Sequence, residues 1–142
     1  MIKVKLKITS VSTEASCEVN SLLNTGYGSE EPEVVLPIGV AEKLGFWPKV
    51  PESAVVEAYE AAGGSKLTMH YLANAIKIQA ITEDKKSKVV KCALAISELE
   101  REVLLSDQAI DELEIVIESP GRGLWRFRDE VKVRGSAEPQ YW

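Results

Sequence analysis

Apolar residues alternate with lysine from Ile2 to Ile8, so that every second side chain belongs to the same face of an extended chain. This two-residue period is the one expected of a β-strand with one buried and one exposed face. The same period returns in residues 14–23, where one face is formed by Ala15, Cys17, Val19, Ser21 and Leu23. The first part of the chain therefore predicts two strands that are each buried on one side.

Short extended segments continue through the rest of the chain, separated by residues that favour turns. Further strands are predicted for residues 54–60, 66–81, 88–96, 102–105, 114–118 and 124–127. Gly63-Gly64, the charged run 83–87 and Ser119-Pro120-Gly121 mark three of the turns between them. Many short strands at close spacing are typical of an all-β domain that closes into a barrel or packs as a sandwich.

Two short helices are predicted between these strands. The first begins after Pro37 and ends at Gly45, a residue suited to the position just past a helix end. The second is capped by Ser106, with Asp107 favoured in its first turn by the helix dipole, and runs to about Leu113.

Length and composition limit the classes of protein to which the chain can belong. With 142 residues, a single domain is expected, which we place at residues 1–128, followed by a polar C-terminal tail at residues 129–142 that frays unless Tyr141 and Trp142 dock. The net charge of −5 gives no general attraction to nucleic acid. No apolar run approaches the length needed to cross a bilayer, and no signal peptide is evident, so we expect a cytoplasmic protein.

The cysteines and the histidine do not indicate a metal or redox site. Cys17 and Cys92 lie far apart in apolar segments and are expected to be buried thiols. His70 is the single histidine of the chain and has no partner pattern around it. We expect no metal and no organic cofactor.

The segment most informative about function is Leu22 to Ser29, in which an apolar strand ends in Asn24-Thr25-Gly26. Glycine accepts unusual backbone angles and allows close approach of another chain. Such a turn can present one side chain at a crowded centre, although most segments of this composition are ordinary turns. Tyr27 follows directly and either borders a substrate pocket or covers the end of the domain.

The order of the neighbouring motifs resembles the retropepsin-like aspartic proteases, in particular their small prokaryotic single-domain branch. After Asn24-Thr25-Gly26 come Leu36-Pro37, the short helix with Ala41-Glu42-Lys43-Leu44-Gly45, a Gly-Gly hairpin, and Leu104-Leu105-Ser106 opening a last helix. The resemblance covers roughly residues 2 to 127. The first motif and the helix match closely, whereas the hairpin and the last motif, with Ser106 in place of glycine, match loosely.

The resemblance implies a retropepsin-like closed β barrel with one or two short helices that forms a homodimer and cleaves a peptide or protein substrate. Asn24, Thr25 and Gly26 would form the catalytic loop, with Thr25 bonding across the dimer axis. The hairpin from Ala61 to Lys66, with Gly63 and Gly64, would cover the substrate, and Tyr27 would contact it. The Leu104-Leu105-Ser106 segment would pack behind the loop.

Asn24 departs from this family, which carries aspartate at that position. An amide cannot accept a proton at neutral pH, so a pair of asparagines lacks a general base. Three readings follow. The chain is an aspartic endopeptidase inactivated by an Asp-to-Asn exchange, a non-catalytic pseudo-protease that binds peptides or serves assembly, or an unrelated β domain without a cleft at Asn24.

Overall fold

The computed structural model describes residues 1–60, 63–64 and 66–142, for Tyr59 the backbone only. Its strands are β1 (Lys3–Ser10), β2 (Ser16–Leu23), β3 (Glu33–Pro37), β4 (Val55–Glu60), β5 (Lys66–Ala80), β6 (Val90–Ser97), β7 (Val103–Leu105), β8 (Ile115–Ser119), β9 (Leu124–Phe127) and β10 (Arg134–Gly135). Its helices are α1 (Ile38–Lys43) and α2 (Asp107–Glu112). No helix among the described residues is long and apolar enough to cross a membrane.

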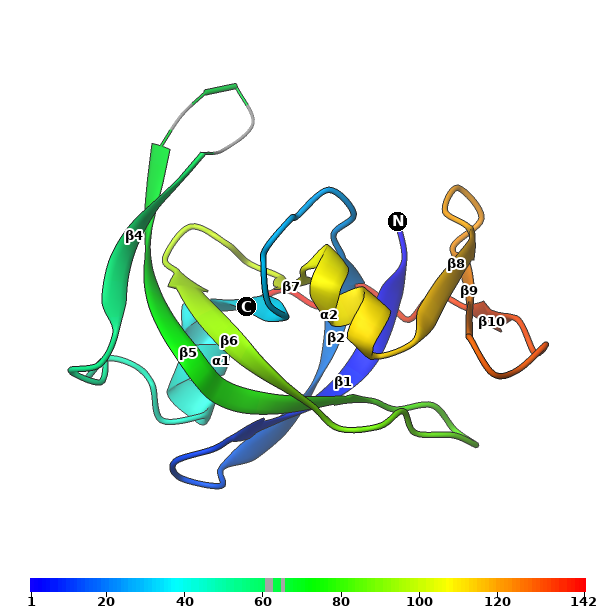
Figure 1. Ribbon diagram of the computed structural model, residues 1–142, viewed down its shortest axis with the longest axis horizontal. Coiled ribbons are helices and arrows are strands. Elements are labelled where there is room, and N and C mark those ends of the chain that lie inside the picture. Colours follow the sequence, from blue (N-terminus) through cyan, green and yellow to red (C-terminus); the bar gives the residue numbers. More distant parts are fainter. Residues whose placement is uncertain (61–62, 65) are drawn as a thin grey trace.

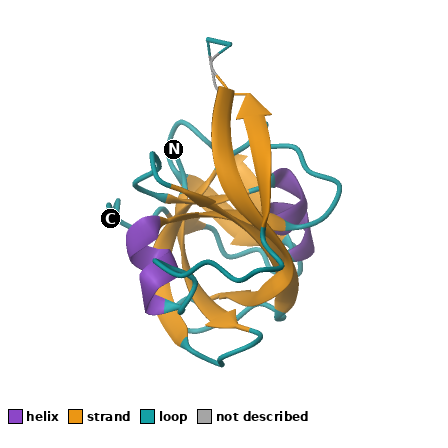
Figure 2. Ribbon diagram, turned by 90° about the vertical axis from the view of Figure 1, so that its left-hand side faces the viewer, coloured by secondary structure: helices purple, strands orange, loops and turns teal. Residues whose placement is uncertain are grey.

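Seven strands form one sheet in the order β1-β2-β7-β3-β6-β5-β4. Because β1 also pairs with β5, six of these strands close into a barrel and β4 remains outside the ring. β4 and the outer half of β5 stand out from the barrel as a hairpin (Figure 1, Figure 2). The expected closed β barrel with two short helices is therefore confirmed.

The alternation at the start of the chain sets the inner face of the barrel. Val4, Leu6 and Ile8 are buried, and Val4 and Leu6 lie opposite Ser21 and Val19 of the antiparallel neighbour β2. The Ser21 hydroxyl donates a hydrogen bond to the Val4 carbonyl, so this buried polar group is satisfied. The predicted inner faces of both strands are thus the faces that the core uses.

A local distortion divides the long strand β5 into two parts with different neighbours. Its register against β6 shifts between Leu72 and Ile76, and Asn74 between them has a φ of 50°. A bulge of this kind bends a strand and increases its twist. The inner half continues the barrel beside β1, whereas the outer half leaves it to pair with β4. The sequence predicts this strand as a single unbroken segment, because no period marks the bend.

The two helices begin and end as their capping residues predict. The Ser106 hydroxyl accepts the N–H of Ala109 and so caps α2. Gly45, just past α1, has a φ of 85°, a conformation that glycine adopts without strain. The strand expected from residue 14 begins only at Ser16, because Glu14 has a φ of 62° and turns the chain.

The C-terminal segment lies against the barrel. β10 pairs with β9, and the Ala137 N–H donates to the Lys3 carbonyl. The Trp142 N–H donates to the Arg101 carbonyl, and the Trp142 indole packs partly buried against the core and the backbone of Gly39. Of the two residues expected to dock the tail, Trp142 does so, while Tyr141 remains largely exposed.

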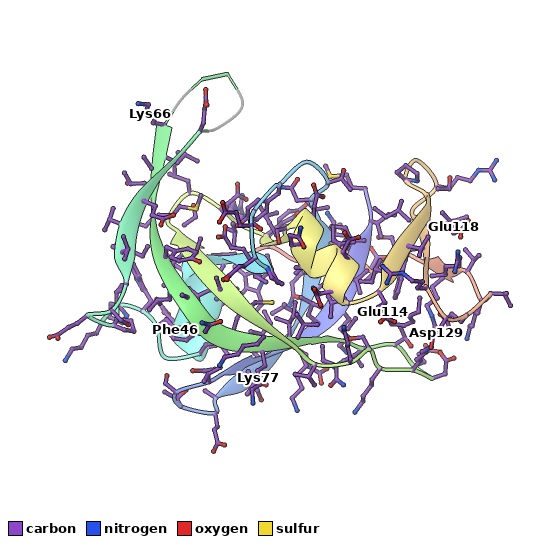
Figure 3. All side chains as sticks on the ribbon, in the orientation of Figure 1. Phe46, Lys66, Lys77, Glu114, Glu118 and Asp129 are labelled. Atoms are coloured by element: carbon purple, nitrogen blue, oxygen red, sulfur yellow. The ribbon has the colours of Figure 1, made fainter. Side chains whose placement is uncertain are left out.

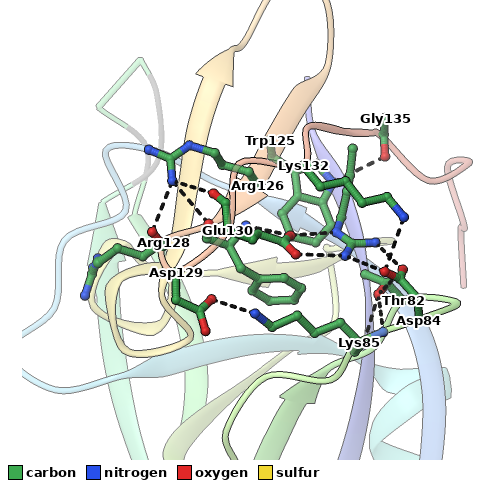
Figure 4. Close-up of polar contacts among 12 residues, drawn as sticks. Thr82, Asp84, Lys85, Trp125, Arg126, Arg128, Asp129, Glu130, Lys132 and Gly135 are labelled. Carbon is green, nitrogen blue, oxygen red and sulfur yellow. Dashed lines mark hydrogen bonds and ion pairs between the residues drawn. The ribbon is translucent and has the colours of Figure 1, made fainter.

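Ion pairs fasten the same segment to the turn after β5 (Figure 4). The Arg134 guanidinium contacts the Asp84 carboxylate at 2.7 Å and the Glu130 carboxylate at 2.9 Å, and Lys132 contacts Asp84 at 3.2 Å. Hydrogen bonds from Arg134 and then Lys132 hold the pKa of Asp84 well below its usual range. This network joins segments about fifty residues apart and holds the C-terminal segment against the barrel.

Candidate functional site

The Asn24 loop, residues 24–28, begins where β2 ends and takes its shape from backbone hydrogen bonds. The Asn24 N–H donates to the Leu105 carbonyl at 3.2 Å, and the Tyr27 N–H donates to the Asn24 carbonyl at 3.0 Å, which closes a turn. Gly26 has a φ of 91°, with open space where a Cβ would stand. The backbone angle, and not lack of room, therefore makes glycine the suitable residue.

β7, the strand next to β2 in the barrel, supports this loop. It runs parallel to β2, with Leu23 opposite Leu105, and antiparallel to β3 on its other side. Leu105 is fully buried and therefore anchors the segment in the core. Leu105 and Ser106 consequently lie directly behind the Asn24 loop.

Ser106 joins the start of α2 to the start of β3. Its hydroxyl accepts the N–H of Glu33 at 3.0 Å in addition to the Ala109 N–H that it caps, and its own N–H donates to the Glu33 carbonyl. Ser106 is fully buried, so these bonds are shielded from water. Ser106 thus makes contacts that a glycine, which has no hydroxyl, could not make at this position.

Asp107 contacts the Asn24 loop although it lies 81 positions further along the chain. Both oxygens of its carboxylate lie 3.2 Å from the Gly26 nitrogen, and its own N–H donates to the Tyr27 carbonyl at 2.9 Å. Sequence reasoning placed Asp107 only as a favourable first residue of α2. No local pattern signals a contact between residues 81 positions apart.

Glu33 lies beneath the same loop. The sequence places it at the end of a charged stretch, yet its residue is only 7% exposed and its carboxylate accepts a hydrogen bond from the Tyr27 hydroxyl. Burial raises the pKa of Glu33, the Tyr27 hydrogen bond lowers it, and the nearby charge of Glu57 raises it again. The Tyr27 hydroxyl is therefore held by a polar contact with Glu33.

A cleft of about 620 Å³ opens between the Asn24 loop and the β4–β5 hairpin. It is lined by Asn24, Thr25, Gly26, Tyr27, Gly28, Val35, Glu60, Leu67, Met69, Glu100 and Leu104. Lys66, labelled in Figure 3, marks the outer part of this hairpin beyond the barrel. The cleft has the loop on one side, the hairpin on the other, and apolar side chains from β3, β5 and β7 among its walls.

A second hollow of about 460 Å³ adjoins the cleft and shares Asn24, Glu100 and Leu104 with it. Its other walls include Leu22, Leu99 and Tyr141. Asn24 is half-buried between the two hollows, and its side chain forms no hydrogen bond with any residue in the described part of the chain. Its amide is therefore available to a ligand or to another chain.

The structure brings together four of the six residues predicted for the site. Asn24, Thr25, Gly26 and Tyr27 border one cleft, whereas Gly63 and Gly64 lie toward the hairpin tip and do not line it. The expected covering segment also includes Ala61, Ala62 and Ser65, which lie outside the described residues. Glu60, Leu67 and Met69 are the hairpin residues that border the cleft, and the sequence did not single them out.

No group of three or more His, Cys, Asp or Glu side chains within the described ranges is arranged to hold a metal ion. No known protein-family model matches the chain, and no curated protein matches it either.

Proposed function

We propose that this chain is an aspartic endopeptidase of retropepsin type in an inactive form, with Asn24 in place of the catalytic aspartate. The observation that carries the proposal is the position of Asn24. Asn24 lies on a loop held by backbone hydrogen bonds at the wall of a cleft. Its side chain borders two hollows and forms no hydrogen bond within the described part of the chain. The β4–β5 hairpin forms the opposite wall, as a segment that closes over an extended peptide would.

The chemistry of this proposal requires two carboxylates. When a second subunit brings its own loop to within about 3 Å, two aspartates at position 24 cannot both ionise, so one acts as base and the other as acid on a shared water. An asparagine keeps the shape of the side chain but neither accepts nor donates that proton. Loss of general acid–base catalysis alone lowers the rate by about 10²–10⁴-fold.

The exposure of the loop supports a homodimer as the working form. Thr25 and Gly26 are exposed, and the Thr25 hydroxyl has no hydrogen-bond partner in the described part of this subunit. Leu99, on the adjoining hollow, is 72% exposed and therefore offers apolar surface to a partner. A second copy placed against this face would cover Leu99 and give Thr25 a partner.

A second function is favoured by Asn24 itself. A pseudo-protease that holds peptides without cleaving them needs the cleft but not the carboxylates. Val35, Leu67, Met69 and Leu104 give the cleft apolar surface for peptide side chains, which favours binding. The remaining alternative, an unrelated β domain, predicted no cleft at Asn24, whereas a cleft is present there.

The deciding experiment compares the chain with its Asn24→Asp variant on denatured protein and a peptide library between about pH 3 and 7, the range in which carboxylate pairs titrate. Asn74→Asp serves as the matched control, because Asn74 is an exposed asparagine outside the cleft. Cleavage by Asn24→Asp alone, blocked by a peptide mimic with a central hydroxyl, supports the peptidase.

A folded, dimeric Asn24→Asp protein that cleaves nothing would refute the peptidase. Peptide binding by both proteins would then favour the pseudo-protease. A monomer at concentrations where peptides bind would show instead that a single subunit makes the complete site.

A further inference from the structure

Side-chain packing leaves Gly26 of the Asn24 loop unrestrained. Its φ of 91° lies in a region open to glycine, and no atom lies within 4 Å of the position where a Cβ would stand. Packing therefore does not restrain this residue. The Asn24 side chain has no hydrogen bond in the described part of the chain, so its direction depends on the backbone that carries it.

Asp107 holds the loop at two successive residues, Gly26 and Tyr27. Its carboxylate accepts the Gly26 N–H with both oxygens at 3.2 Å, and its N–H donates to the Tyr27 carbonyl at 2.9 Å. A hydrogen bond to an ionised acceptor is stronger than one between neutral groups. Asp107 is the first residue of α2 and directly follows the buried Ser106, so its backbone is held in place.

We infer that Asp107 is a positioning residue, whose carboxylate fixes the Gly26 peptide and thereby the direction of the side chain at position 24. This role rests on the function proposed above, since it concerns the geometry of that reaction. Displacing a reacting group by about 1 Å can cost about 100-fold in rate. The hydrogen bonds from Asp107 limit such displacement at a point of the loop that side-chain packing does not restrain.

The alternative role of Asp107 is only to favour the start of α2. The two roles separate experimentally, because Ser106 supplies the helix cap and remains when residue 107 is replaced. Asp111 provides a matched control. It is another exposed aspartate of α2, and its carboxylate, unlike that of Asp107, forms no hydrogen bond to the Asn24 loop in the described part of the chain.

The first measurement uses the chain as it stands and needs no activity. Asp107→Ala should accelerate amide exchange at Gly26 about tenfold, the change expected when a hydrogen bond to a charged acceptor is lost. Asp107→Asn keeps an acceptor oxygen and should restore most of the protection, and Asp111→Ala should change nothing at Gly26. Unchanged exchange at Gly26 in Asp107→Ala overturns the inference.

The second measurement adds the same changes to the Asn24→Asp protein. Asp107→Ala should lower kcat about ten- to 100-fold with KM within about twofold, and Asp107→Asn should recover most of kcat. Full kcat in Asp107→Ala, or an equal loss in Asp111→Ala, overturns the inference while the peptidase stands. If Asn24→Asp with Asp107 intact is folded and dimeric but inactive, the proposed function fails and this role for Asp107 fails with it.

Discussion

Replacing Ser106 by alanine should destabilise the protein strongly for so small a change. The hydroxyl is fully buried and accepts two backbone N–H groups, those of Glu33 at 3.0 Å and Ala109 at 3.2 Å. Loss of a serine cap costs about 1 kcal/mol. Leaving the Glu33 N–H buried without a partner costs about 1–3 kcal/mol more. We therefore expect the free energy of unfolding to fall by about 2–4 kcal/mol.

The assay is equilibrium unfolding in urea, with the slope against denaturant checked to be unchanged, so that the midpoint reports stability. Ser97→Ala is the matched control. The Ser97 hydroxyl also accepts two backbone N–H groups, from Leu99 and Glu100 at 3.2 Å each. Ser97 itself is buried, but Leu99 is exposed and Glu100 half-buried, so water can reach these two N–H groups when the hydroxyl is removed. This variant should therefore lose about 1 kcal/mol or less.

The reasoning would be refuted if Ser106→Ala lost no more stability than Ser97→Ala. Such a result would mean that water or a shift of β3 satisfies the Glu33 N–H, and that Ser106 does not join β3 to α2.

Two further predictions concern titratable groups. Burial, followed by the nearby charge of Glu112, raises the pKa of the Cys92 thiol to about 12. Alkylation by iodoacetamide at pH 8 should therefore label the half-buried Cys17 first and Cys92 only on unfolding. Mass spectrometry of the labelled peptides measures this order. Burial also raises the pKa of Glu33 in the folded protein above that of an unfolded glutamate. The folded state therefore holds the Glu33 proton more tightly, and the stability this contributes is present below the unfolded pKa and lost as the pH rises through the folded pKa. In urea unfolding, the stability of Glu33→Gln relative to the parent should therefore increase as the pH rises from about 4 to 7. A difference in unfolding free energy that stays constant over that range would contradict a raised pKa for Glu33.

Local pattern determined much of the fold. The lysine alternation placed Val4, Leu6 and Ile8 in the core, because side chains of a strand point alternately to its two faces. Ser106 and Gly45 marked helix ends, since capping and positive φ depend on chemistry within a few residues. The grouping of Asn24, Thr25, Gly26 and Tyr27 at one cleft also followed from a contiguous motif.

Only the tertiary structure decided which distant segments meet around that motif. β7 pairs with β2 on one side and β3 on the other, and this places Asp107 against Gly26 across 81 positions of sequence. The bend at Asn74 turns the outer half of β5 toward the cleft, so that Met69 borders it. Periodicity states which face of a segment is buried but not against which partner, because pairing is chosen by the packing of the whole core.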